Sequence, residues 1–224
     1  MALHTSFCYT GTMFVIHIIT LFIFILVLAC VFHKSFVEML PVGISGLVLL
    51  LYVLSFGRHL GWIDGIAPLL LCGGVLYFFT RKREQRKELL RQCIEILKDP
   101  STIAGLILLL LVVIGVSGKV VSWWDDYNFW ATDVKSIFYR NGFADKYANA
   151  APEFGDYPPG TQMMKWWFLH FSPGQFREGL LFAGYYVFNL SFLLPLLHYI
   201  RKKTPLSMTL GAILLWIFPT MTEV

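Results

Sequence analysis

Six long apolar segments, separated by shorter polar stretches, dominate the chain. They cover residues 13–32, 42–56, 66–80, 102–121, 180–200 and 206–221. A helix of about 20 predominantly apolar residues crosses the hydrocarbon core of a bilayer. The pattern therefore predicts an all-α fold: a polytopic transmembrane helix bundle of about six spans. The second and third segments are short, so both a full crossing and a re-entrant helix fit them.

Composition supports a membrane protein. Hydrophobic residues make up 57% of the chain, charged residues 14%, and the mean hydropathy is +0.65. Soluble domains carry about 25% charged residues. The net charge of +4 comes from short basic clusters between apolar segments. Such clusters orient membrane proteins, so we expect no nucleic-acid partner. The four cysteines show neither CxxC spacing nor a histidine at zinc spacing.

Lysine and arginine positions predict the topology. One basic loop opens at Arg81 and extends to Lys98, and a second cluster covers residues 201–203. Two crossings separate these clusters, so both lie on one side, and the positive-inside rule makes that side cytoplasmic. The N-terminus and the loop 122–178 are then outside a cell membrane, which we take to be a bacterial plasma membrane. Residues 84–97 have the apolar spacing of an amphipathic helix on the cytoplasmic surface.

The outer loop begins with an amphipathic pattern. Placed on a helix, residues 122–140 gather Tyr127, Trp130, Val134 and Phe138 on one face, with Lys135 opposite. A helix with an apolar face and a polar face is typical of the membrane interface. The pattern predicts an interfacial helix with its aromatic face towards the membrane.

Two adjacent carboxylates, Asp125 and Asp126, follow the fourth segment closely. A partly desolvated carboxylate at the end of a span acts as a base or holds a divalent metal, here Mg²⁺ or Mn²⁺. Neighbouring residues of a helix point 100° apart, so the two cannot share one role. Ser122 and Asp125 also have the spacing of a capping box, and that structural role stays an alternative for Asp125.

Further along, Tyr157 opens a Tyr-Pro-Pro-Gly turn that two prolines make rigid. The aromatic residues after it favour an interfacial belt over a platform for sugar stacking. They are Trp166, Trp167, Phe168 and Phe171, and His170 among them is expected to be structural.

The order of these features resembles the GT-C superfamily of membrane glycosyltransferases, in its protein-mannosyltransferase-like and aminoarabinose-transferase-like branches. An acidic pair follows a span, an amphipathic helix comes next, and a Pro-Pro turn closes the loop, all within residues 101–224. The resemblance implies transfer of a sugar from a polyprenyl-phosphate-linked donor to an acceptor on the outer face. Residues 1–100 are then a three-span N-terminal extension, and we expect the chain to be the N-terminal part of a longer enzyme.

The resemblance also implies roles for individual residues. Asp126 or Asp125 is the base or a metal ligand, and basic residues near the loop bind the donor phosphate. Carboxylates before the turn support the metal or the acceptor. The implied partners are the lipid-linked donor and membrane lipids. The implied substrate-binding residues are Lys135, Arg140, Lys165, Glu153, Asp156 and Tyr157.

Two other functions remain as alternatives. A transporter or flippase component predicts ionisable residues within the spans, and apart from His17 the span centres carry almost none. A non-enzymatic scaffold predicts that Asp125 and Asp126 tolerate replacement by asparagine.

Overall fold

The computed structural model describes residues 2–122, 129–143, 160–172, 174–200, 204–207 and 209–213. Within these ranges the chain is helical and holds no strand, so the predicted all-α fold is confirmed. The helices are α1 (Ala2–Phe32), α2 (Phe36–Phe56), η1 (Leu60–Trp62), α3 (Ile63–Thr80), α4 (Arg83–Lys98), α5 (Pro100–Val116), α6 (Ala131–Arg140), α7 (Gly160–Leu169), α8 (Glu178–Leu193) and α9 (Pro195–Ile200).

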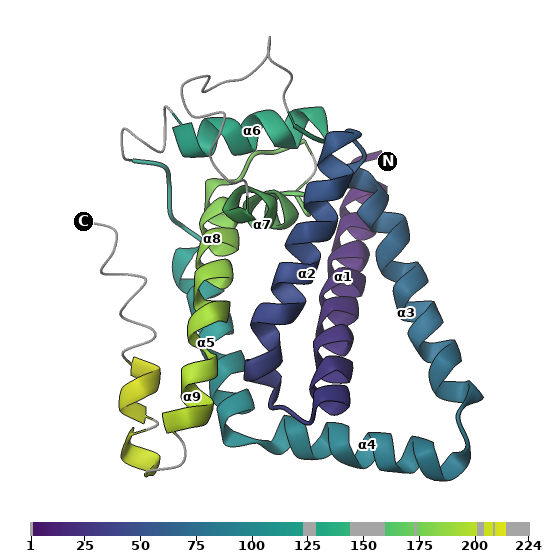
Figure 1. Ribbon diagram of the computed structural model, residues 1–224. Helices are drawn as coiled ribbons and strands as arrows, with labels where there is room; N and C mark the ends of the chain where they lie inside the picture. The colour runs from purple at the N-terminus through teal and green to yellow at the C-terminus, as the bar shows by residue number, and fades with distance from the viewer. Residues whose placement is uncertain are drawn as a thin grey trace.

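The long helices run between the two ends of a bundle, and other helices lie across those ends (Figure 1). Helices α1, α2, α3, α5 and α8 form the bundle, while α6 lies across one end with α7 beneath it. Helix α4 lies across the opposite end and joins α3 to α5. We call these the α6 end and the α4 end. The N-terminus lies at the α6 end, so the basic helix α4 and the N-terminus are at opposite ends of the bundle.

Four helical segments of the described chain are long and apolar enough to cross a membrane. They are Thr12–Phe32, Phe36–Phe56, Leu60–Thr80 and Glu178–Ile200. Helix α5 passes the same test only together with α4, from which it is bent by 63°. The described residues thus hold four or five of the six predicted spans, and most of the sixth, residues 206–221, lies outside them. Many apolar side chains of α3 and α5 are exposed, as expected for helices that face lipid.

Two predicted span boundaries are wrong, and at the first of them a capping box overrides the hydrophobic pattern. Helix α2 begins at Phe36, ahead of Pro41, since Ser35 and Glu38 form a capping box. The Ser35 N–H donates to Glu38 Oε2 at 2.9 Å, and the Glu38 N–H donates to Ser35 Oγ at 3.3 Å. At the other end of the bundle, α5 ends at Val116 and does not continue to Val121.

Helix α4 confirms the predicted amphipathic helix, while its place on the cytoplasmic surface of a membrane stays a prediction. It covers Arg83–Lys98 and packs on the α4 end of α1 and on α5. Charged residues on its exposed side pair along the helix, such as Arg91 with both Glu88 and Glu95 at 2.6 Å. The sequence pattern of α4 therefore predicts the helix and its exposed charged side.

Helix α6 agrees with the predicted pattern but not with the predicted start. It begins at Ala131, and Ser122 is not helical, while residues 123–128 lie outside the described part. Ala131, Val134 and Ile137 are buried, as the pattern predicts, but this face packs on α7. The position of α6 is thus determined by its packing on α7.

The turn between α2 and α3 holds the far end of α6. Asn141 ends the helix in the left-handed conformation, with φ 58°. Its Oδ1 accepts a hydrogen bond from the Gly61 N–H at 2.8 Å, and its carbonyl accepts one from the Leu60 N–H at 3.2 Å. Asparagine tolerates this conformation better than most residues. Helix α6 is therefore fixed across the end of the bundle.

Helix α7 is enclosed by the bundle, and the predicted aromatic belt is wrong. Every residue from Gln162 to Leu169 is buried, and the exposed fractions of Trp166 and Trp167 are 1% and 2%. These side chains belong to the same core cluster as residues of α2, α5 and α8. Since α2 packs on α1 and also on α7, α8 and α9, the halves 1–100 and 101–224 share one core.

Gly184 allows α7 and α8 to approach closely. A Cβ atom at this position would lie 2.6 Å from the Met164 carbonyl oxygen and 2.7 Å from Lys165 Cα. Both contacts are with backbone, so neither can move aside without shifting a helix. This close contact keeps the side chain of Lys165 buried.

We predict that Gly184→Ala destabilises the protein by about 1–3 kcal/mol, the usual cost of overpacking. Gly73→Ala is the matched control: it is also within a helix, but its Cβ would meet nothing within 4 Å. Thermal unfolding in lipid nanodiscs should show a lower melting temperature for Gly184→Ala and an unchanged or higher one for Gly73→Ala. Equal melting temperatures for the two variants would contradict the close contact.

Candidate functional site

The segment after α5 is held against the first turn of α8. A Cβ at Gly179 would collide with the Ser117 carbonyl oxygen, so the two backbones touch. Glu178 Oε2 accepts a hydrogen bond from the Val121 N–H at 2.6 Å. These contacts fix residues 117–122, the segment that leads to Asp125 and Asp126.

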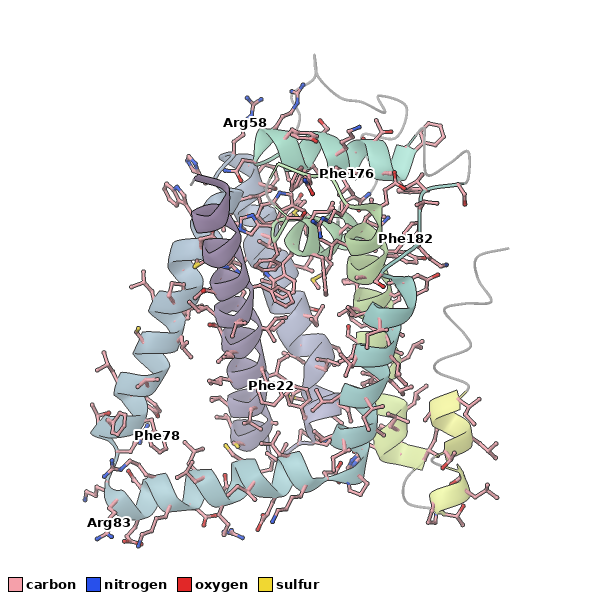
Figure 2. The ribbon with its side chains drawn as sticks, turned by 180° about the vertical axis from the view of Figure 1, so that it is seen from behind. Phe22, Arg58, Phe78, Arg83, Phe176 and Phe182 are labelled. Carbon is pink, nitrogen blue, oxygen red and sulfur yellow. The ribbon has the colours of Figure 1, made fainter. Side chains whose placement is uncertain are left out.

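Lys119 lies on this segment and points at α8. Its Nζ donates a hydrogen bond to the Tyr186 hydroxyl at 3.3 Å. The same nitrogen lies 5.3 Å from the ring centroid of Tyr186 and 5.6 Å from that of Phe182. Phe182 is labelled on α8, close to α5, in Figure 2. An ammonium over aromatic faces is stabilised by their negative charge density.

Lys165 comes to the neighbouring tyrosine from α7. It is only 5% exposed, and its Nζ lies 5.1 Å from the ring centroid of Tyr185. The rings of Tyr185 and Tyr186 are 5.4 Å apart. Burying an ammonium is costly unless charges or dipoles compensate it. Lys165 of α7 and Lys119 of the segment after α5 thus lie beside one pair of adjacent tyrosines, at the α6 end of the bundle.

The two basic residues predicted on α6 do not join this pair. Lys135 and Arg140 are both exposed. The Lys135 Nζ lies 5.8 Å from the ring centroid of Phe176, which Figure 2 labels beneath α6. Of these three predicted basic residues, the structure buries Lys165 and leaves Lys135 and Arg140 exposed. Lys119, another of the basic residues near the loop, follows α5 and lies beside the same tyrosine pair as Lys165.

The other predicted site residues lie outside the described part of the chain. They are Asp125, Asp126, Glu153, Asp156 and Tyr157. Among the described residues there is no group of three side chains suited to a metal ion. The Mg²⁺ or Mn²⁺ site at the acidic pair stays a prediction.

A second polar cluster, which the sequence analysis missed, lies between α1, α3 and the end of α7. Asp64 Oδ1 is 3.1 Å from His17 Nε2 and 2.9 Å from His170 Nε2. His170 stacks on Trp166, with the ring centroids 4.7 Å apart. His17 within a long apolar segment was the signal, because a buried imidazole needs a polar partner. Its partners are 47 and 153 positions away in the chain, by subtraction of residue numbers, so no local pattern points to them.

Comparison of the chain with protein-family models, with curated proteins and with solved structures gives no match. The function of the chain is therefore inferred from its geometry. At the α6 end that geometry presents two ammonium groups and two phenol hydroxyls, which suit an anionic group such as a phosphate. The His17–Asp64–His170 cluster suits proton exchange.

Asp133 in the first turn of α6 provides a test of how α6 is packed. Burial raises the pKa of its carboxyl above the ordinary value. A raised pKa in the folded state means that ionisation opposes folding, so stability falls as the pH rises through that pKa. We predict that Asp133→Asn raises the melting temperature at pH 7 and that this gain disappears near pH 3. Circular dichroism melts at both pH values would show it, and a loss of stability at pH 7 would contradict it.

Proposed function

We propose that this chain is an integral membrane glycosyltransferase, or part of one. It transfers a sugar from a polyprenyl-phosphate-linked donor to an acceptor at the α6 end of the bundle. The observation that carries the proposal is the buried Lys165, which meets Lys119 at the tyrosine pair of α8. A second support is the resemblance of residues 101–224 to the GT-C superfamily.

The lysine pair would recognise the donor phosphate. Lys165 and Lys119 supply two positive charges in a setting with little water, where charge interactions are stronger than in solution. The hydroxyls of Tyr185 and Tyr186 would add hydrogen bonds. Helix packing holds both lysines in place, since α7 touches α8 at Gly184 and residues 117–122 touch α8 at Gly179.

The lipid tail of the donor would lie along α5. Ile107, Leu110 and Ile114 are 52%, 60% and 60% exposed on this helix, which leads directly to Lys119. A polyprenyl chain on this apolar surface would bring its phosphate to the end of α5. Binding along α5 keeps the donor next to the site, so transfer does not require a diffusive encounter in solution. The barrier to transfer is lower for this reason.

The acidic pair would act on the acceptor. Asp126, with Asp125 as the alternative, would take the proton of the acceptor hydroxyl as its oxygen attacks the anomeric carbon. The bond between that carbon and the phosphate oxygen breaks, and the phosphate leaves with the electron pair. Lys119 and Lys165 would stabilise the charge that develops on the leaving phosphate. A divalent metal held by the acidic pair would supply the same stabilisation.

Binding of the donor phosphate is the first test. Lys165→Met is expected to weaken binding of polyprenyl phosphate about tenfold, because a charge-assisted contact is lost. Lys87→Met at the α4 end is the control, since it also removes a lysine charge but should leave binding unchanged. Native mass spectrometry in nanodiscs measures both. Equal binding of polyprenyl phosphate by the two variants would show that Lys165 does not bind the donor phosphate.

Transfer itself is the second test. Radiolabelled polyprenyl-phosphate-linked hexoses and pentoses would be offered to the protein in membranes that contain its native acceptors. Asp126→Asn is expected to lower transfer by 100-fold or more, a typical effect of losing a general base, while polyprenyl phosphate still binds. Transfer by Asp126→Asn and Asp125→Asn at the wild-type rate would contradict the mechanism and favour a scaffold.

A further inference from the structure

The cluster at the other face of α7 has no role in the proposed transfer. Three side chains meet there: His17 from α1, Asp64 from the first turn of α3, and His170, which follows α7. Lys165 and His170 are five positions apart, which is about 140° around a helix. The lysine pair and this cluster are therefore on different faces of the same segment.

Aromatic rings enclose the cluster on its inner side. The ring of His17 lies 5.1 Å from Phe171 and 6.3 Å from Trp167, and His170 stacks on Trp166. The side chain of His17 is 1% exposed, against 28% for Asp64 and 20% for His170. Access from solvent is thus through Asp64 and His170, with His17 as the enclosed end.

The charges of the cluster balance only when one imidazole is protonated. In the described part of the chain, the ion pairs of Asp64 are those with His17 and His170. Two neutral imidazoles would leave one uncompensated negative charge, and two imidazolium groups would leave a positive one. A net charge out of water is costly, so the state with a single added proton is favoured.

The geometry of His17 is a second reason why the state with a single added proton is favoured. Its Nε2 is enclosed, lies 3.1 Å from Asp64 Oδ1, and makes no hydrogen bond there. A neutral imidazole would leave this buried nitrogen without a partner, which costs free energy. An imidazolium is compensated by Coulomb attraction to the carboxylate, which depends less on direction.

Other ionisable groups on the surrounding helices are engaged elsewhere. His59, beside η1, stacks flat on Trp62 with the centroids 4.3 Å apart. Glu38 of α2 is in the capping box at the α4 end, and Glu178 of α8 bonds the Val121 N–H. On α6, Asp133 is half-buried, and Lys135 and Arg140 are exposed. Among the residues that the structure describes, the ion pairs that bear on the charge state of the cluster are those between its own three members.

We propose that His17, Asp64 and His170 form a proton-binding site. The cluster takes up one proton from the aqueous phase at the α6 end and holds it on an imidazole paired with the Asp64 carboxylate. His170 exchanges with solvent, and His17 is the enclosed acceptor. The bound proton joins α1 and α3 to the end of α7. The proposal is independent of the transferase function.

Intrinsic fluorescence provides the readout, because a protonated imidazole quenches a neighbouring indole. Trp166 reports on His170 and Trp167 on His17. The full chain is studied in nanodiscs with Trp62→Phe, which removes the separate signal of the His59–Trp62 stack. Imidazole ordinarily changes charge between pH 5 and 8, so we expect a reversible fluorescence transition in this range.

Asp64→Asn keeps the shape of the side chain and removes its charge. We expect the midpoint of the transition to move to lower pH by about one unit or more, because a carboxylate at this distance favours the protonated imidazole. His59→Gln is the matched control and should leave the midpoint unchanged. Should Asp64→Asn fail to fold, His170→Gln is the second variant, and it is expected to remove the Trp166 part of the transition.

Three results would overturn the proposal. One is the absence of a transition in the parent protein, and another is an Asp64→Asn midpoint equal to that of the parent. The third concerns micromolar Zn²⁺. If Zn²⁺ abolishes the transition in the parent protein but not in a His17→Gln variant, the cluster is a metal site.

Discussion

The enclosure of α7 by the other helices is the constraint on which both polar sites depend. This helix of ten residues is buried from Gln162 to Leu169, and its backbone touches that of α8 at Gly184. Because the two helices are so close, Lys165 is held away from solvent beside Tyr185. The same packing brings Trp167 close to His17 of α1 and His170 to Asp64 of α3. If α7 lay on the surface, neither lysine nor histidine would have a defined partner.

Polar groups inside such a bundle have few ways to be satisfied. Lipid offers no hydrogen bonds, so each buried charge must find its partners within the protein. Asp64 meets two imidazoles, and Lys119 meets a tyrosine hydroxyl and two aromatic faces. Ionisable residues at membrane depth are costly and usually functional. The two clusters are therefore the candidate functional sites of this chain, because burying their charges costs stability.

The ends of the bundle differ in how they are closed. At the α4 end, a single amphipathic helix with paired charges covers α1 and α5. At the α6 end, closure depends on several separate contacts: Asn141 on the α2–α3 turn, Glu178 on Val121, and α6 on α7. Closure by many contacts brings residues from distant parts of the chain together. For this reason the candidate chemistry lies at the α6 end.

Local sequence patterns predicted several elements well. The periodicity of residues 84–97 predicted α4, and that of residues 131–140 predicted which side chains of α6 are buried. Long apolar segments predicted most of the bundle. Boundaries were less accurate, because the capping box at Ser35 and Glu38 starts α2 ahead of Pro41. The hydrophobic pattern alone does not show where α2 begins.

The sequence by itself determined that the chain is helical, that its apolar segments suit a membrane, and which ends carry the basic residues. Each of these follows from neighbours within a few turns of helix. Only the tertiary structure decided that Trp166 and Trp167 are core residues, that Lys165 is buried, and that Asp64 joins His17 to His170. The physical reason is distance along the chain: these contacts join segments whose relative positions are set by helix packing, and no periodicity records which helices become neighbours.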